Sequence, residues 1–372
     1  MQNTSAHNFN YWKKLYDDNK LEEFNFNDSG LLWLKIKSIV RKELLSDFLQ
    51  ENKIGLINKS LSEQFIELYE LMNKDTCGKS HQQLDDFIRN KNKEQLKNLD
   101  IKKLVSELYK LKYFDWGGDY KNALDKYLVD SYVKVYQSYD DLVSKFDNEI
   151  GRAVQGYVLC SWYNNWSSIL IEHIFKTHPI VLPAVGKIKK VDFFINNIPF
   201  DLKVTYLPAN FIEKKRKEKG LKPELTELKQ KARQSQISFT KHNKADDTYY
   251  EIVEKMKDRN DEICKETLQS IKKIRLEILN EAKQNPKILI QNLYEEQGEM
   301  RFDSANRLFL ILVDTEDFDN SWKLKRNLDL LTPAIKNYLD NFLSKKIEDL
   351  RIKFTYENQE FEAFSDIIFV VK

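Results

Sequence analysis

Cysteine is scarce in this chain, and several familiar metal and nucleotide motifs are missing. The 372 residues contain three cysteines, Cys77, Cys160 and Cys264, which lie far apart and form no CxxC pair. Zinc sites and disulfide frameworks need paired or closely spaced cysteines, so we interpret these three as inert thiols in a reducing compartment. Five histidines occur without an HExxH arrangement, which argues against a histidine-dependent metalloprotease or a zinc deaminase.

Three further absences concern nucleotides, membranes and net charge. The chain has no GxxxxGK[ST] loop, so ATP-driven work is not expected. No apolar run approaches the length of a membrane span, and the N-terminus lacks the apolar core of a signal peptide, so we expect a cytoplasmic protein without a membrane partner. Lys and Arg number 60 against 58 Asp and Glu. Any nucleic-acid surface must therefore come from local segregation of charge.

The order of predicted elements indicates two domains and an α/β core. Apolar residues at three- and four-residue spacing predict a helical N-terminal domain over residues 1–148. Residues 149–372 are expected to form an α/β domain, in which a mixed sheet is flanked by helices. Strands are predicted at 307–314 and 366–371, and a charged helical insertion at about 209–284.

The segment VDFFINNIPFDLKV, residues 191–204, predicts a two-residue β-hairpin. Branched and aromatic residues alternate around Asn196-Asn197, and asparagine tolerates the left-handed backbone that such turns need. With this turn, Asp192 faces Asp201 across the two strands. Lys203 shares their face, because strand side chains repeat every two residues.

Two like charges opposite each other destabilise a sheet by about 0.2–1 kcal/mol, so something must neutralise the aspartates. Lys190 and Lys203 could be purely structural counter-ions, but we favour a bound cation with Lys203 completing the site. Mg²⁺ can be held by one or two carboxylates and keep its other positions for water and phosphate. The lysine can orient the attacking water or stabilise developing charge, and the peptide carbonyl of Leu202 would lie at the same edge.

These residues resemble the PD-(D/E)XK nuclease superfamily, whose restriction-endonuclease-like fold contains a sheet with a β-hairpin between helices. By this resemblance Asp192 matches the first acid, and Asp201 and Lys203 match the second half-motif. Glu172 falls where many members carry an additional acid on the preceding helix. Val191 departs from the family motif, which has proline before the first acid.

The resemblance covers about residues 155–205, with 306–315 as a later core strand, and it carries functional expectations. It implies a Mg²⁺-dependent endonuclease, for which Mn²⁺ can substitute, that cuts double-stranded DNA as a homodimer. A type II restriction enzyme or a related defence nuclease is the first hypothesis, with a cognate methyltransferase encoded separately. The alternatives are a non-catalytic nucleic-acid-binding or scaffold module that reuses the fold, and an RNA-directed nuclease.

A local basic segment provides the expected DNA contact. Residues 214–244 hold eleven Lys or Arg against three Glu. Such clusters bind backbone phosphates, and arginine and glutamine can also read base edges. The alternative is that the segment is only the solvated face of a helix and binds no nucleic acid. A second cluster precedes the strand predicted at 307–314. The predicted DNA-binding residues are Lys190, Lys214, Lys215, Arg216, Lys217, Arg233, Gln234, Gln236, Arg301 and Arg307.

Overall fold

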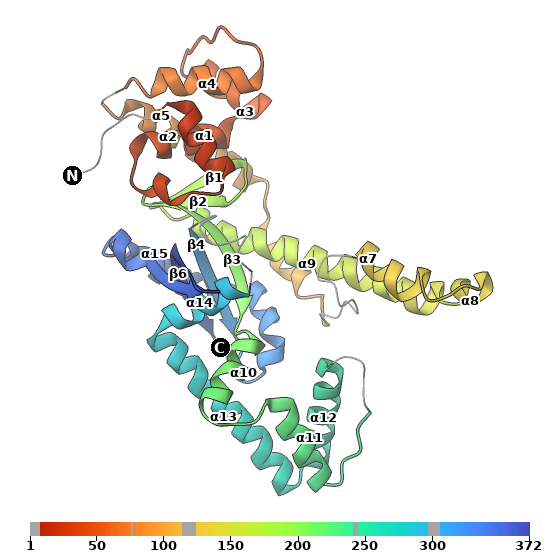
Figure 1. Cartoon of the computed structure of the whole chain (residues 1–372). Coiled ribbons are helices and arrows are strands. Elements are labelled where there is room, and N and C mark those ends of the chain that lie inside the picture. Colours follow the sequence, from red (N-terminus) through yellow and green to blue (C-terminus); the bar gives the residue numbers. More distant parts are fainter. Residues whose placement is uncertain (1–7, 76, 114–123, 241–244, 297–305) are drawn as a thin grey trace. The chain divides into compact units, whose positions relative to one another are not determined.

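The chain, represented by a computed structural model, divides into two compact units (Figure 1). The structure describes residues 8–75, 77–113, 124–240, 245–296 and 306–372. Unit 1 comprises Met1–Asp17, Glu23–Phe200 and Trp322–Ser344, and unit 2 comprises Asp18–Glu22, Asp201–Ser321 and Lys345–Lys372. The boundary expected near residue 148 therefore falls inside unit 1.

A six-stranded mixed sheet confirms the α/β class. The strand order is β1-β2-β3-β4-β6-β5. β1, β2 and β3 pair antiparallel, β4 pairs parallel with both β3 and β6, and β5 pairs antiparallel with β6. The strands are β1 (Val181–Ile188), β2 (Val191–Ile195), β3 (Ile198–Tyr206), β4 (Arg307–Val313), β5 (Arg351–Tyr356) and β6 (Gln359–Val371).

The N-terminal helices of unit 1 form because their apolar residues recur on one face. Helix α4 buries Phe65, Leu68 and Met72, as its three- and four-residue spacing predicts. Its N-cap is Ser60, whose hydroxyl accepts a hydrogen bond from the amide of Glu63. The helices are α1 (Phe9–Asp17), α2 (Asp28–Ile39), α3 (Lys42–Glu51), α4 (Leu61–Met72), α5 (Lys79–Lys97), α6 (Ile101–Leu108) and α7 (Leu124–Leu128).

Strand β1 ties these helices to the hairpin, because α2 and α5 both pack on it. A Cβ at Gly186 would stand 2.0 Å from the carbonyl oxygen of Ser38 in α2. Arg89 of α5 donates a hydrogen bond to the carbonyl oxygen of Val181, 3.0 Å away. The N-terminal helices and the hairpin thus share one set of contacts, which explains why no boundary falls near residue 148.

The predicted hairpin is confirmed. Asn196 and Asn197 join β2 to β3, and both adopt the left-handed region, with φ of 48° and 67°. The ladder runs from the Ile195–Ile198 pair to the pair of Phe193 with Phe200. Helix α9 (Gly151–Lys176) and helix α15 (Leu328–Phe342) cover one face of this hairpin.

Two aromatic contacts fix that cover. Phe175 of α9 stacks on Phe193 with ring centroids 4.9 Å apart. Phe342 of α15 meets Phe200 edge to face at 5.9 Å. Since successive strand residues point to opposite faces, Asp192, which precedes Phe193, belongs to the other face of β2.

In unit 2 the insertion is helical, as expected, and has its own core. The described part forms α10 (Ala209–Glu218), α11 (Glu224–Gln234), α12 (Ala245–Arg259), α13 (Glu262–Gln284) and α14 (Pro286–Glu295). One apolar cluster joins α11, α12 and α13 through Leu228, Ile252 and Ile271. Another packs α10, α13 and α14 against the sheet face of Phe309 and Ile311.

The predicted C-terminal strands are confirmed in part. β4 lies within 307–314, and every one of its residues is buried. The strand expected at 366–371 is the end of the longer β6, which forms an unexpected hairpin with β5 through Glu357 and Asn358, at φ of 46° and 64°.

The remaining elements are short. They are a 3-10 helix (Glu22–Asn25), a π-helical turn (Val129–Val133), α8 (Tyr139–Val143), a second π-helical turn (Phe146–Ile150), and 3-10 helices at Phe318–Arg326 and Ile347–Leu350. Within the described ranges, none of the helices combines the length and the apolar character that crossing a membrane requires.

Candidate active site

Asp201 and Lys203 lie side by side on β3, as their spacing predicts. Lys203 Nζ donates a hydrogen bond to Asp201 Oδ1 over 2.9 Å, so the two side chains share a face of the sheet. The side chain of Asp201 is 13% exposed and that of Lys203 is 40% exposed. The carboxylate is therefore nearly enclosed, while the ammonium group reaches solvent.

Arg307, the first residue of β4, is a second cation beside Asp201. The parallel ladder pairs these two residues, and Arg307 Nε lies 3.9 Å from Asp201 Oδ2. The arginine is buried, with its guanidinium group 5.0 Å from the ring centroid of Tyr294 in α14. Its backbone carbonyl accepts a hydrogen bond from the hydroxyl of Ser365.

This position corrects the prediction that Arg307 contacts DNA from a loop. The residue begins a buried strand, where β-sheet pairing and Tyr294 enclose it. The structure instead makes Arg307 a neighbour of the candidate catalytic carboxylate. Sequence reasoning missed this role, because the neighbour across a parallel ladder depends on which distant strands pair.

Asp192 occupies β2 in unit 1 and is partly buried. The turn at Asn196 and Asn197 supports the register that predicts the pairing of Asp192. Within unit 1 the observed ladder ends at the pair of Phe193 with Phe200, one position closer to the turn than Asp192. Asp201 belongs to unit 2, so the pairing of the two aspartates stays a prediction.

Glu172 lies on α9 and has a partner on the same helix. Lys176 Nζ donates a hydrogen bond to Glu172 Oε2 over 2.6 Å. Helix α9 packs on the face of β2 that carries Phe193, and Asp192 belongs to the opposite face. The role of Glu172 as an additional acid stays a prediction, with Lys176 as its observed counter-ion.

The donor set around Asp201 is compatible with Mg²⁺ in chemical type. The amide of Asp201 donates to the carbonyl of Asn306, toward β4, and the carbonyl of Leu202 points the opposite way because peptide groups alternate along a strand. In the described ranges no group of three or more His, Cys, Asp or Glu side chains is placed to hold a metal. Mg²⁺ needs fewer, because one or two carboxylates suffice when waters and phosphate complete its shell.

Arg216 corrects the predicted DNA surface. It is fully buried, and its guanidinium group pairs with Glu227 and donates to the carbonyl oxygen of Lys222. Buried in this way, it offers no surface to a phosphate. The signal was present in the sequence, since Arg216 follows the buried Ile212 by one helical turn.

The other predicted DNA contacts near Arg216 differ in exposure, since the side chain of Lys214 is 49% exposed and that of Lys215 is 13% exposed. Lys214 Nζ lies 3.8 Å from Glu295, and Lys215 pairs with Glu218 over 2.7 Å. Lys217, Arg233, Gln234 and Gln236 are exposed. Apart from Lys215, whose side chain is mostly enclosed, these residues are accessible to a nucleic acid. All of these contacts stay predictions.

Two more predicted DNA contacts lie elsewhere. Lys190 sits in the β1–β2 turn at φ of 74°, with its ammonium group 5.3 Å from the ring centroid of Tyr16. Burial lowers the pKa of the Lys190 side chain, and the charge of Asp17 opposes this shift. Arg301 lies outside the described residues.

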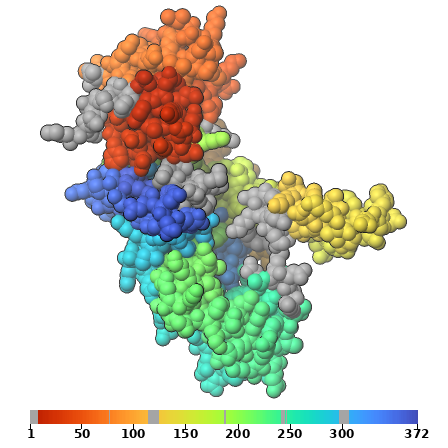
Figure 2. Space-filling view, in the orientation of Figure 1, coloured from red at the N-terminus to blue at the C-terminus, as the bar shows by residue number. Residues whose placement is uncertain are grey.

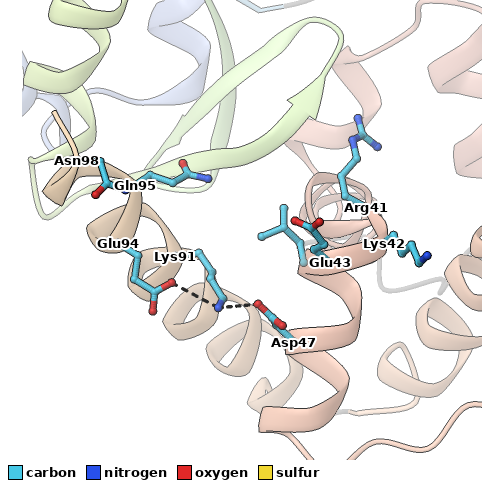
Figure 3. A pocket seen from close by; sticks show the side chains of 9 residues that line it. Arg41, Lys42, Glu43, Asp47, Lys91, Glu94, Gln95 and Asn98 are labelled. Atoms are coloured by element: carbon cyan, nitrogen blue, oxygen red, sulfur yellow. Dashed lines mark ion pairs between the residues drawn. The ribbon is translucent and has the colours of Figure 1, made fainter.

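A polar groove between α3 and α5 in unit 1 contains none of the predicted site residues (Figure 3). Lys91 lies within it, 2.8 Å from Asp47 and 3.5 Å from Glu94. These ion pairs neutralise the charge of Lys91 within the groove, and we assign the groove no role.

No family model, curated protein or solved structure matches this chain.

Proposed function

We propose that this chain is a Mg²⁺-dependent endonuclease that hydrolyses phosphodiester bonds of double-stranded DNA. The observation that carries the proposal is the contact of Asp201 with Lys203 on a strand that leaves a two-residue hairpin and then pairs parallel with β4. An acid and a lysine two residues apart on such a strand form the second half of the PD-(D/E)XK motif that the sequence resembles.

The exposure of the two groups suits a division of labour. Asp201 is held between Lys203 and Arg307, so its carboxylate is fixed in place. Lys203 is partly exposed and can leave Asp201 to meet a substrate. Its ammonium group would then orient the attacking water or stabilise the charge that develops on the phosphorus oxygens.

Asp201 and the carbonyl of Leu202 would hold the metal, with Asp192 as the second carboxylate. Glu172 is left out of this set, because α9 covers the face of β2 opposite to Asp192. Bound Mg²⁺ would neutralise the phosphate and lower the pKa of a water ligand, and Mn²⁺ offers the same hard coordination. The exposed lysines of α10 and the polar residues at the end of α11 would engage DNA phosphates. A homodimer and a separately encoded methyltransferase, as in type II restriction, belong to the same proposal.

The decisive experiment is cleavage of supercoiled plasmid by the purified chain with Mg²⁺, with Mn²⁺ and with EDTA. We expect nicked and linear products with either metal, none with EDTA, and none from the Asp201→Asn and Asp192→Asn variants. RNA of matched sequence serves as the competing substrate. Cleavage that persists in EDTA or in Asp201→Asn would overturn the proposal, and preferential cutting of RNA would redirect it.

One observation favours a second candidate, a non-catalytic nucleic-acid-binding module. Two cations already neutralise Asp201 within the protein, so its charge needs no metal for balance. Calorimetric titration with Mn²⁺ separates the two candidates. The nuclease requires metal binding that Asp201→Asn removes, whereas the binding module predicts DNA affinity without metal binding.

A further inference from the structure

Unit 1 contains a helical arm, residues 124–159, that presents apolar side chains to solvent. The arm comprises α7, α8, the two π-helical turns and the N-terminal part of α9. Figure 1 shows α7 beside the N-terminal part of α9 and α8 beyond the start of α9, away from β1 and β2, and the arm is yellow in Figure 2. Surface of this kind needs an explanation, because soluble chains rarely gather exposed apolar side chains in one region.

The stretch from α8 into α9 is nearly one continuous helix with an apolar repeat. Its apolar residues recur at alternating spacings of four and three, which places them along one stripe, as in the seam of a coiled coil. The stripe consists of Tyr139, Val143, Phe146, Ile150, Ala153, Tyr157 and Cys160.

Only one end of this stripe is covered. Ala153 and Cys160 are buried, 7% and 5% exposed. Tyr139, Val143 and Phe146 are 79%, 43% and 52% exposed. A single seam thus passes from core to bare surface along one helix, which suggests that another helix covers the bare end.

The bare surface is large enough for a specific interface. Five more apolar side chains of the arm are 36–61% exposed: Val129, Val133, Val135, Val154 and Val158. Leu159 is exposed as well, but it follows the stripe residue Tyr157 by two positions and so lies on the opposite side of the helix. Together with the three bare stripe residues the five valines expose on the order of 800 Å², which is about what each partner contributes to a standard interface.

The charges of the arm argue against a nucleic acid as the partner. Six Asp or Glu face four Lys or Arg between residues 124 and 159, an excess of two negative charges. Lys134 pairs with Asp130 over 2.7 Å, and Lys145 pairs with Glu149 over 2.6 Å. With these lysines engaged inside the arm, its recognition surface is apolar.

We propose that the arm is the dimerisation surface of this chain and that its occupant is the arm of a second copy. A two-fold interface uses the same patch twice, so two arms would bury at most about 1,600 Å², the size of a standard stable interface. A second copy also brings the matching helical stripe that knobs-into-holes contact requires.

The test is sedimentation equilibrium of the full chain over a micromolar concentration series. We expect wild type to have the mass of two chains, and Val143→Glu with Phe146→Glu to have the mass of one. Ile57→Glu is the matched control, because Ile57 is 90% exposed and lies off the arm. It should stay dimeric. A monomeric wild type, or a double variant that stays dimeric, would overturn the proposal.

Hydrogen exchange of wild type at low and high protein concentration gives a readout that needs no variant. Amides between residues 139 and 159 should exchange more slowly at high concentration, when the dimer forms. Equal exchange in this segment at both concentrations in a dimeric protein would place the interface elsewhere and refute the assignment. Neither measurement involves DNA, so a chain without nuclease activity would leave both tests intact.

Discussion

Asp201 on β3 and Glu224 at the start of α11 both belong to unit 2, and each faces two cations. Arg275 donates three hydrogen bonds of 2.6–3.1 Å to the carboxylate of Glu224, and Arg216 lies 3.8 Å from the same carboxylate. Asp201 has Lys203 at 2.9 Å and Arg307 at 3.9 Å. Each cluster places one carboxylate beside two cations, so this pattern of charges alone does not show which cluster has a catalytic role.

Their access to solvent differs. Glu224 and Arg216 are buried, and Arg275 is 12% exposed and also stacks over Tyr249. Burial lowers the pKa of Arg275, but the hydrogen bonds and charge of Glu224 outweigh it and raise that pKa above its ordinary value. At Asp201, in contrast, one of the two cations remains 40% exposed. We call the Glu224 cluster sealed, because it is closed to solvent and can only stabilise the fold. We call the Asp201 cluster open, because the exposed Lys203 can exchange Asp201 for a substrate.

Lys203→Ala tests the open cluster and carries the largest expected effect. Plasmid cleavage should fall by about 10²–10⁴-fold, the usual contribution of a group that transfers protons or stabilises charge in the transition state. The free energy of unfolding should change by less than about 1 kcal/mol, because the pair is partly exposed. Cleavage kinetics and urea unfolding measure the two quantities.

Lys353→Ala is the control for that change, since Lys353 is exposed on β5 in the same unit. It should leave both quantities unaltered. Wild-type turnover by Lys203→Ala would show that the open cluster is as inert as the sealed one.

Arg275→Met tests the sealed cluster. The change keeps an apolar side chain in place of the arginine stem but removes the hydrogen-bonded cation from the buried Glu224 carboxylate. The free energy of unfolding should therefore fall by about 3–5 kcal/mol. Lys272→Met, one turn earlier on α13, removes an exposed pair with Glu316 and should cost at most about 1 kcal/mol. Equal losses for both variants in urea unfolding would mean that burial does not distinguish these ion pairs.

Arg307 lies between the two cases, since it is buried but belongs to the open cluster. We expect Arg307→Gln to lower kcat about 10–100-fold with little change in KM, as for residues that orient a catalytic ligand. Arg307→Lys should recover part of kcat, because it restores the charge beside Asp201. A purely structural role would instead lower the fraction of active enzyme, and kcat per active site, obtained by titration, would stay at the wild-type value.

The contrast also shows how far the sequence could lead. Local patterns sufficed for the hairpin, because Asn196 and Asn197 signal the turn and alternation gives the register. The contact of Asp201 with Lys203 followed from the two-residue repeat of a strand. The sheet class and the helical insertion followed from periodicity.

Contacts between distant segments were not predictable in the same way. Arg307 meets Asp201 through a parallel ladder that joins segments about a hundred residues apart. β5 escaped notice, because charged residues alternate with apolar ones in a short edge strand that only β6 completes. Arg216 looked like a surface cation within a basic run until its partner helices were known.

The basic surface of α10 provides the smallest expected effect. Lys214 and Lys217 are exposed, and Arg216 between them is buried, so the surface lysines can meet phosphates without disturbing the sealed cluster. Replacing both with Gln should reduce the slope of log affinity against log salt by up to about 0.9 for each phosphate that is no longer neutralised. The reduction should be alike for a cleavable and a random duplex, because phosphate contacts carry no sequence information.

Fluorescence anisotropy over a salt series, with Ca²⁺ in place of Mg²⁺ to suppress cleavage, measures the slope. Lys353→Gln serves as the control. A slope that matches wild type in the double variant would identify this part of α10 as a solvated helical face.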